Sequence, residues 1–311
     1  MTRFLSLSPS AGRNPFTVPG VPIAPLPTTA PFASGRMLAG FLLLAAIVLP
    51  MHQAHADLMI NPTRIVFDKN RRSAQIDLIN DGATSATYRL VLVNRRMTEA
   101  GEFNAIETPG PGDQFADPML VYSPRQITLA PGAQQLVRVA LRKPEELAAG
   151  EYRSHLFFEK VADTTAENNI DNLGRAPAGE VVVSLTALIG VSIPVIVRHG
   201  DTGAEVAIDH LALEKSGAAQ APLLTLQLNR SGNRSVYGDL TVSFTPQGGA
   251  AQVIGKAAGV AVYTPNPLRR AKLDLQVPAG VALTRGTLSV SYQERAEDGG
   301  KMMAQTAIEL P

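Results

Sequence analysis

The chain has 311 residues, of which 45% are hydrophobic, and a formal net charge of +1 at pH 7. This length predicts about two domains, and the nearly balanced charge gives no electrostatic basis for a nucleic-acid partner, which requires a basic surplus. There are no cysteines, which excludes disulfides, metal–thiolate sites and a thiol nucleophile.

The first 56 residues read as a leader. Residues 38–49, LAGFLLLAAIVL, follow Arg36 and form an apolar run that is too short to span a bilayer, which takes about 20 apolar residues. The sequence Ala-His-Ala at 54–56 fits a small-x-small cleavage signal. We therefore predict a leader and secretory signal peptide at 1–56, and a mature protein that is exported and not embedded in a membrane.

From residue 57 onward, short segments alternate between apolar and polar residues, which is typical of β-strands. SAQIDLIN, for example, places Ala74, Ile76 and Leu78 on one face. We predict strands in this half at 73–80, at 87–94, at 125–141 (two strands about a turn at Pro131 and Gly132) and at 151–161.

The next predicted strand stands out by its length. Residues 162–180 are polar and acidic with Gly and Pro, and predict a loop. VVVSLTALIGVSIPVIVRHG at 181–200 then alternates over roughly twice the length of a typical strand. One face of this strand carries only apolar side chains: Val183, Leu185, Ala187, Ile189, Val191 and Ile193.

The pattern breaks at RHGDTGAE, residues 198–205, and we place a domain boundary there. The second half restarts with short alternating strands between Gly, Pro and Asn turns. Such strands at intervals of about 8–12 residues are typical of β-sandwiches. The predicted fold is therefore all-β, with two sandwich domains at 57–199 and 200–311.

The sequence shows no catalytic constellation. The histidines beyond the leader have no metal-ligand spacing, and no GxSxG, P-loop or GxGxxG motif occurs. Two acidic pairs, Glu145–Glu146 and Glu297–Asp298, lie in turn-like segments, and we interpret them as solvated surface. We expect no enzyme activity, no cofactor and no metal, which disfavours a sandwich hydrolase or carbohydrate-active enzyme.

The long apolar strand favours a binding function instead. An edge strand exposes unpaired N–H and C=O groups, which is a liability unless a partner covers them. In β-augmentation these groups bind a partner's backbone, and alternate side chains fill the partner's pockets. The alternative is that the strand packs into its own sandwich.

Five segments carry, in order, motifs of one known family. PTRIVFDKNRRSAQIDLINDGATSATYRL at 62–90 contains T-R-x-x-F, a turn and an alternating strand that ends in Asn. The other four are SPRQITLAPGAQQLVRV at 123–139, GEYRSHLFF at 150–158, GVSIPVIVRHG at 190–200 and LNRSGNRSVYGDLTV at 228–242. By the order and spacing of these motifs, essentially all of residues 57–311 resembles a divergent member of the PapD-like family of periplasmic pilus (fimbrial) chaperones.

The resemblance implies two immunoglobulin-like sandwiches in a boomerang arrangement. It also implies donor-strand complementation, in which the chaperone lends its long strand to a pilin (fimbrial) subunit that lacks its last strand. The subunit is then passed to an outer-membrane usher, without nucleotide or metal. In this chain the donor side chains would be those from Val183 to Ile193.

The same resemblance assigns roles to individual residues. Arg64 falls on the family's cleft arginine, which holds the subunit's C-terminal carboxylate, and Arg153 falls on a shared arginine that we expect in an inter-domain ion pair. The family's second anchor, a lysine, falls on Pro194. Either Arg64 holds the carboxylate alone, or another cation assists it, for which Arg89 and Arg198 are the candidates.

Two further matters are left open by the sequence. A secreted β-sandwich protein with a structural or adhesive role at the cell surface is the alternative to a chaperone. Exposed edge strands would also let the free protein self-associate.

Overall fold

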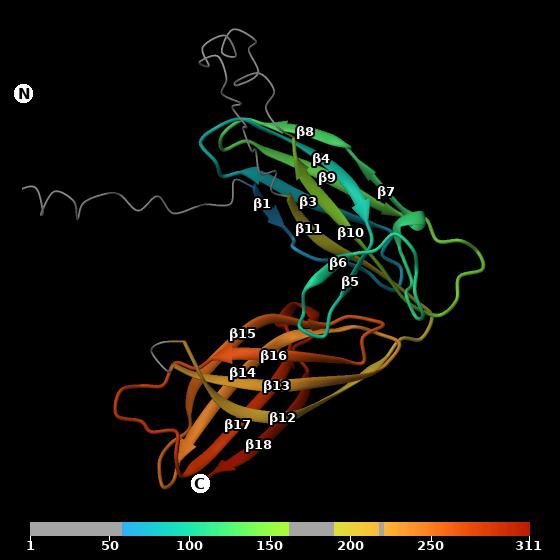
Figure 1. Ribbon diagram of the computed structural model, residues 1–311. Helices are drawn as coiled ribbons and strands as arrows, with labels where there is room; N and C mark the ends of the chain where they lie inside the picture. Colours follow the sequence, from blue (N-terminus) through green and yellow to red (C-terminus); the bar gives the residue numbers. More distant parts are fainter. Residues whose placement is uncertain (1–57, 162–189, 218–220) are drawn as a thin grey trace, which may run out of the picture. The chain divides into compact units, whose positions relative to one another are not determined.

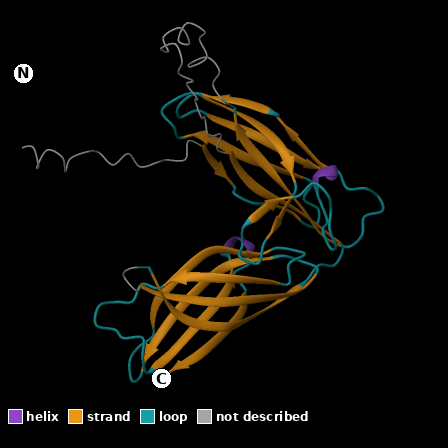
Figure 2. Cartoon of the chain, viewed as in Figure 1, coloured by secondary structure: helices purple, strands orange, loops and turns teal. Residues whose placement is uncertain are grey.

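The computed structural model describes residues 58–161, 190–217 and 221–311. Nearly all of its regular elements are strands (Figure 2). Within the described ranges the helical elements are two 3-10 turns, η1 at Asp117–Met119 and η2 at Ala296–Asp298, and no helix is long and apolar enough to cross a membrane. The all-β prediction is confirmed. The predicted leader and the loop at 162–180 lie outside the described residues.

The first sandwich packs a four-stranded sheet against a five-stranded one (Figure 1). In order across the four-stranded sheet, the strands are β1 (Leu58–Asn61), β3 (Ser73–Asn80), β9 (Gln134–Leu141) and β7 (Leu120–Ser123). In order across the five-stranded sheet, they are β2 (Ile65–Phe67), β11 (Gly190–His199), β10 (Gly150–Lys160), β4 (Ala86–Val93) and β8 (Gln126–Leu129).

The core of this sandwich follows the alternation of its strands. Along β3 the burial changes at every residue, and Ala74, Ile76 and Leu78 point into the core. Most neighbouring strands are antiparallel, but β2 runs parallel to β11. A separate hairpin joins β5 (Arg95–Met97) to β6 (Phe103–Ala105).

The second sandwich has its own core between two sheets. One sheet contains, in order, β12 (Ala204–Ser216), β13 (Ala221–Gly232) and β16 (Leu268–Asp274). The other contains β15 (Gln252–Val262), β14 (Val236–Pro246), β17 (Gly286–Glu294) and β18 (Met302–Leu310). The chain crosses between the sheets after β13, β15 and β16, which is the Greek-key pattern of immunoglobulin-like sandwiches.

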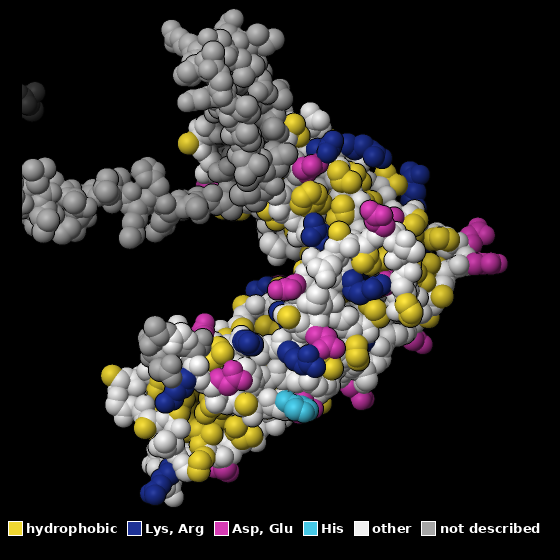
Figure 3. Space-filling view, viewed as in Figure 1, with side chains coloured by type: hydrophobic (Ala, Val, Ile, Leu, Met, Phe, Trp, Pro, Cys, Tyr) yellow, Lys and Arg dark blue, Asp and Glu magenta, His cyan; other side chains and the backbone are white. Residues whose placement is uncertain are grey.

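Two strands close the second sandwich on one side, and a buried tyrosine forms a hydrogen bond in its interior. β12 and β18 lie side by side and cover the gap between the two sheets there (Figure 1). Tyr292 is buried, and its hydroxyl donates to the Val260 carbonyl at 2.7 Å. Burial raises the pKa of Tyr292. On the visible face, Lys and Arg side chains are interspersed with Asp and Glu side chains (Figure 3).

Candidate partner-binding site

Among the described residues, the outer edge of β11 is open along its first half. β11 pairs with β10 along its whole length. On the other side β2 covers only residues 195–197, and within the described ranges no strand pairs with that side of residues 190–194. Free backbone N–H and C=O groups on an edge are a template for a further strand. This edge is therefore the place where another chain can add to the sheet.

The side chains of β11 divide into an exposed start and a buried end. Val191 is 37% exposed, whereas Ile193 is 2% exposed and packs in the first core with Val195 and Val197. The expectation that Ile193 is a donor side chain is therefore wrong, because its own sandwich encloses it. Val191 has the exposure that a donor position needs. The other expected donor positions lie outside the described residues: Val183, Leu185, Ala187 and Ile189.

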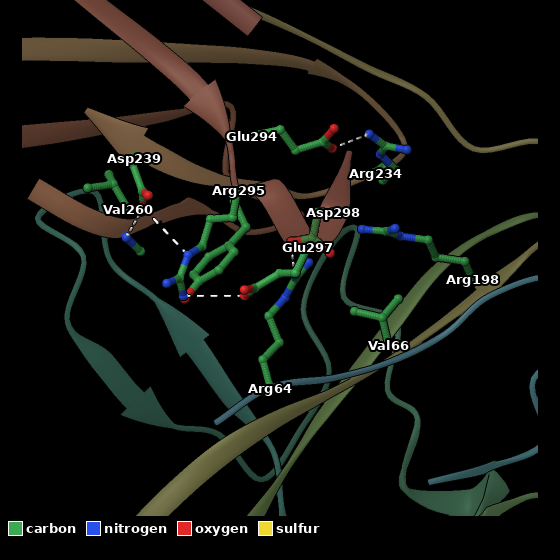
Figure 4. Close-up of polar contacts among 12 residues, drawn as sticks. Arg64, Val66, Arg198, Arg234, Asp239, Val260, Glu294, Arg295, Glu297 and Asp298 are labelled. Carbon is green, nitrogen blue, oxygen red and sulfur yellow. Dashed lines mark hydrogen bonds and ion pairs between the residues drawn. The ribbon is translucent and has the colours of Figure 1, made fainter. Parts of the chain in front are cut away.

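Arg64 lies where the open edge ends. It directly precedes β2, whose first residue, Ile65, pairs with Val195. Its Nη1 donates to Asp298 Oδ2 at 2.9 Å (Figure 4), and its Cζ lies 4.5 Å from the centre of the Tyr237 ring. The side chain is 11% exposed, and its buried Nε has no hydrogen-bond partner among the described residues. The open edge thus ends at a mostly buried guanidinium whose Nε–H has no acceptor among the described residues.

Carboxylates and a second cation surround this arginine. Arg295 Nη1 lies 3.4 Å from Glu297 Oε1, and Arg295 Nε lies 3.8 Å from Asp239 Oδ1 (Figure 4). Arg295 also donates to the Tyr237 hydroxyl at 3.4 Å, and this hydrogen bond, followed by the charge of Glu297, raises the pKa of Arg295. Glu297 and Asp298 lie in an exposed turn, as the sequence predicts, but each carboxylate also pairs with an arginine.

Arg89 lies on β4, two strands away from the open edge and level with its start. It stands opposite Glu159 in the sheet, and its Nη2 lies 2.5 Å from Glu159 Oε2. Glu159 pairs with Gly190, whereas Arg64 directly precedes Ile65, the partner of Val195, and is thus level with Pro194. About 13 Å of strand separates the two rows. The expectation that Arg89 joins Arg64 in holding one carboxylate is therefore wrong.

Arg198, the other candidate for a second anchor, binds an acidic residue of its own sheet. Its Nε donates to Oε2 of Glu151, a fully buried carboxylate, at 3.1 Å. Its carbonyl accepts a hydrogen bond from Lys143 Nζ at 2.7 Å. Pro194 offers neither a charge nor a backbone N–H. Of the expected anchors, Arg64 is the one that lies at the end of the open edge.

Arg153 joins β10 to the turn between β15 and β16. Its Nη2 donates to the carbonyls of Arg95 at 3.2 Å and Thr264 at 3.3 Å, and its Cζ lies 4.3 Å from the centre of the Tyr263 ring. Burial lowers the pKa of Arg153. The described residues give it no ion pair, so the predicted ion pair is replaced by hydrogen bonds to carbonyls and a cation–π contact.

His155 lies next to this arginine in the interior. Its ring packs edge-on against Phe103, with 5.1 Å between centroids, and neither ring nitrogen has a hydrogen-bond partner among the described residues. Burial, followed by the positive charges of Arg153 and Arg95, lowers the pKa of His155 to about 3. His155 is therefore a neutral core residue at physiological pH.

The chemistry available at the site is hydrogen bonding, apolar contact and charge pairing. The open edge supplies backbone donors and acceptors, and Val191 supplies an apolar side chain. Arg64 supplies a guanidinium, whose planar fork of donors matches a carboxylate. In the part of the chain that the structure describes, no His, Cys, Asp and Glu side chains are grouped to hold a metal ion.

Two side chains of the site escape sequence reasoning. Asp298 lies 234 residues from Arg64, so no local motif links the two. Tyr237 follows a turn at the start of β14 and carries no motif of its own. The acidic pair Glu297–Asp298 was the one signal available, and its turn-like context pointed to solvent.

Comparison with known proteins gives likeness of structure only. No family model matches the chain, and no curated protein sequence matches it. The chain is similar to the CsuC–CsuE chaperone–tip adhesion subunit pre-assembly complex from Csu pili of Acinetobacter baumannii (12% identity, 82% of this chain, 98% of that one, TM-score 0.40). It is also similar to the CupB2 chaperone of Pseudomonas aeruginosa (13% identity, 81% and 99%, TM-score 0.38). A third likeness is to the Salmonella enterica SafA pilin–SafB chaperone complex (13% identity, 83% and 98%, TM-score 0.37). At these TM-scores the likenesses carry no conclusion about the activity of this chain.

Proposed function

We propose that this protein is a periplasmic chaperone that captures pilus subunits by adding β11 to their unfinished sheet. The observation that carries the proposal is the open edge of β11, which begins at Gly190 and ends at Arg64. The ordered motifs of the sequence support the same class of protein.

The direction of β2 supports a specific mode of addition. Because β2 runs parallel to β11 and pairs from Ile65 onward, it continues the line that a partner strand on the open edge would occupy. A partner strand parallel to β11 would reach Arg64 with its C-terminal end. Its terminal carboxylate would then meet the guanidinium, and a charge-assisted, bidentate pair is the strongest contact the site offers.

The side chains of the donor strand support an apolar partner groove. Val191 is exposed, and the alternation continues upstream in the sequence through Ile189, Ala187, Leu185 and Val183. Side chains on one face of a strand repeat every second residue, so these positions would enter successive pockets of the partner.

The proposal extends to location and partners. The predicted signal peptide supports export to the periplasm, and a captured subunit would pass from there to an outer-membrane usher. Backbone pairing, apolar contact and one carboxylate clamp require no nucleotide, metal or other cofactor.

The test is isolation of the mature chain from the periplasm of the organism that encodes it, followed by size-exclusion chromatography and mass spectrometry. We expect a 1:1 complex with a small secreted subunit. Arg64→Ala should lower the yield of this complex at least about tenfold, since truncating one member of a desolvated charge pair costs several kcal/mol. Arg89→Ala removes an arginine that lies two strands away from the open edge and serves as the matched control.

Two outcomes would contradict the proposal. If the wild-type chain is recovered in surface polymers, it is a structural or adhesive protein of the cell surface. If Arg64→Ala and Arg89→Ala retain equal amounts of subunit, Arg64 does not hold the carboxylate.

A further inference from the structure

We propose that Asp298 is an internal cap on Arg64, which holds the guanidinium in the free protein and is displaced by the terminal carboxylate of a partner. This inference rests on the proposed function, because it gives that same site a competitor within the chain. It assigns a role to an acidic residue that the capture mechanism itself does not use.

The contact has the chemistry of the expected ligand but lacks its full geometry. Asp298 offers Arg64 a carboxylate oxygen at 2.9 Å, as a chain terminus would. The contact uses only Nη1, and the buried Nε of Arg64 stays without a hydrogen-bond partner among the described residues. A carboxylate that bridges Nη1 and Nη2 end-on would accept two hydrogen bonds where Asp298 accepts one, so a partner's terminus has more to gain at Arg64 than Asp298 has.

The segment that carries Asp298 is suited to leave. The turn η2 has no buried residue, so its displacement exposes little apolar surface. It is followed by Gly299 at φ 121° and Gly300 at φ 67°, conformations that glycine adopts readily and other residues rarely do. Asp298 is itself 31% exposed, against 11% for Arg64, so the carboxylate can return to water while the guanidinium stays in place.

The neighbours of Arg64 keep it in position when Asp298 leaves. The Tyr237 ring lies 4.5 Å from the guanidinium carbon and supports it from one side. Glu297 pairs with Arg295 and is not available to take over from Asp298. Exchange of one carboxylate for another leaves the positive charge of Arg64 neutralised. The cap therefore raises the partner concentration needed for binding, but the group bound by Arg64 is a carboxylate in both states.

The first test measures access to Arg64 directly. The mature chain is treated with phenylglyoxal, which modifies accessible guanidinium groups, and the rate at each arginine is followed by peptide mass spectrometry. Asp298→Asn should raise the rate of modification at Arg64 about fivefold, because a partly exposed ion pair contributes a factor of about that size. Glu297→Gln is the matched control and should leave Arg64 unchanged. Asp298→Ser provides a second uncapped variant, and unfolding of either is detected by circular dichroism.

The second test adds a probe ligand: an acetylated heptapeptide of alternating valine and threonine with a free carboxyl terminus, compared with its carboxamide. The acid should protect Arg64 from phenylglyoxal at about fivefold lower concentration in Asp298→Asn than in the wild type, because the cap reduces the fraction of binding-competent protein. The carboxamide should protect neither.

The outcomes separate the cap from the proposed function. If the acid protects wild type and Asp298→Asn at the same concentration, and labelling of Arg64 is equal in both, the cap is overturned and the carboxylate clamp stands. If Asp298→Asn labels faster but the acid protects neither protein, Asp298 shields Arg64, but the clamp at Arg64 and the displacement of Asp298 by a partner's terminus both fail.

Discussion

Val191 and Ile193 lie two residues apart on one face of β11, yet Val191 is 37% exposed and Ile193 is enclosed in the core. The change from an exposed to a buried side chain occurs just before Val195, where β2 begins to cover the edge of β11. The second half of the described strand therefore belongs to the core of its own sandwich, and the first half has an edge with no paired strand among the described residues.

The first prediction concerns stability along this strand. Ile193→Ala should lower the free energy of unfolding by about 2–4 kcal/mol, because it leaves a cavity in the core. Val191→Ala should change it by less than about 1 kcal/mol, since the side chain is already exposed. Urea denaturation followed by circular dichroism measures both. Equal losses for the two variants would mean that the division of β11 is wrong.

The second prediction concerns capture of a partner. Val191→Asp should leave the fold intact but reduce recovery of the subunit complex, because a carboxylate would enter an apolar groove. Val253→Asp is the matched control, as Val253 is an exposed valine on β15 of the other sandwich. The donor role of Val191 fails if both variants yield as much complex as the wild type.

The third prediction concerns the buried pair of Glu151 and Arg198. Arg198→Ala should lower the free energy of unfolding by about 3–5 kcal/mol, because it leaves the buried Glu151 carboxylate without its partner. Adding Glu151→Gln to that variant should recover part of the loss, since the uncompensated charge is then gone. Thermal melts of the single and double variants measure the coupling, and strictly additive losses would speak against it.

The fourth prediction concerns acid stability. The pKa of His155 is lowered to about 3 in the fold, whereas a histidine in the unfolded chain has its ordinary pKa of 6.5. The unfolded chain therefore binds the proton first, so the stability contributed by neutral His155 is complete above pH 6.5 and is lost as the pH falls from 6.5 toward 3. The loss should reach about 1.4 kcal/mol per pH unit.

The variant His155→Leu isolates this effect, because it cannot take up the proton. Its unfolding free energy should fall less steeply between pH 6 and pH 4 than that of the wild type, as measured by urea titration at each pH. His210→Asn, at an exposed histidine, is the control and should keep the wild-type slope. Parallel curves for wild type and His155→Leu would refute the prediction.

The fifth prediction concerns Asn80, which ends β3 and is fully buried. Its Nδ2 donates to the carbonyls of Thr84 at 2.8 Å and Leu129 at 2.9 Å, and its Oδ1 accepts from the Gly82 N–H at 3.0 Å. Asn80→Ala should cost about 2–4 kcal/mol of stability, because buried groups lose their partners. Chemical denaturation should show almost no change for Asn104→Ala, at an exposed position on β6; a similar small effect for Asn80→Ala would rule out this role.

Sequence reasoning succeeded where a single face of a strand is buried. The two-residue alternation at 73–80 matches β3 at both ends, since alternation reports the burial of one face. It missed β6, whose three residues are all exposed and show no alternation. It also did not list β18, which begins with two methionines in succession.

For the site, sequence reasoning found single residues but not their neighbours. Arg64 was singled out by its motif, and the structure adds its partner Asp298 from the far end of the chain. Arg89 was chosen because it lies in a facing strand, but the sequence does not show which row of the sheet it occupies. Row and register arise from strand pairing, which a single sequence leaves undetermined.

The parallel pairing of β2 with β11 has a consequence for which polypeptides the edge can accept. From Ile65 onward the line beside β11 is filled by the protein's own backbone. A guest that continued beyond its last paired residue would collide with this backbone, whatever its side chains. The edge would therefore accept a strand only if the guest's chain ends there. It would exclude an internal loop of the same composition, because the chain of such a loop continues.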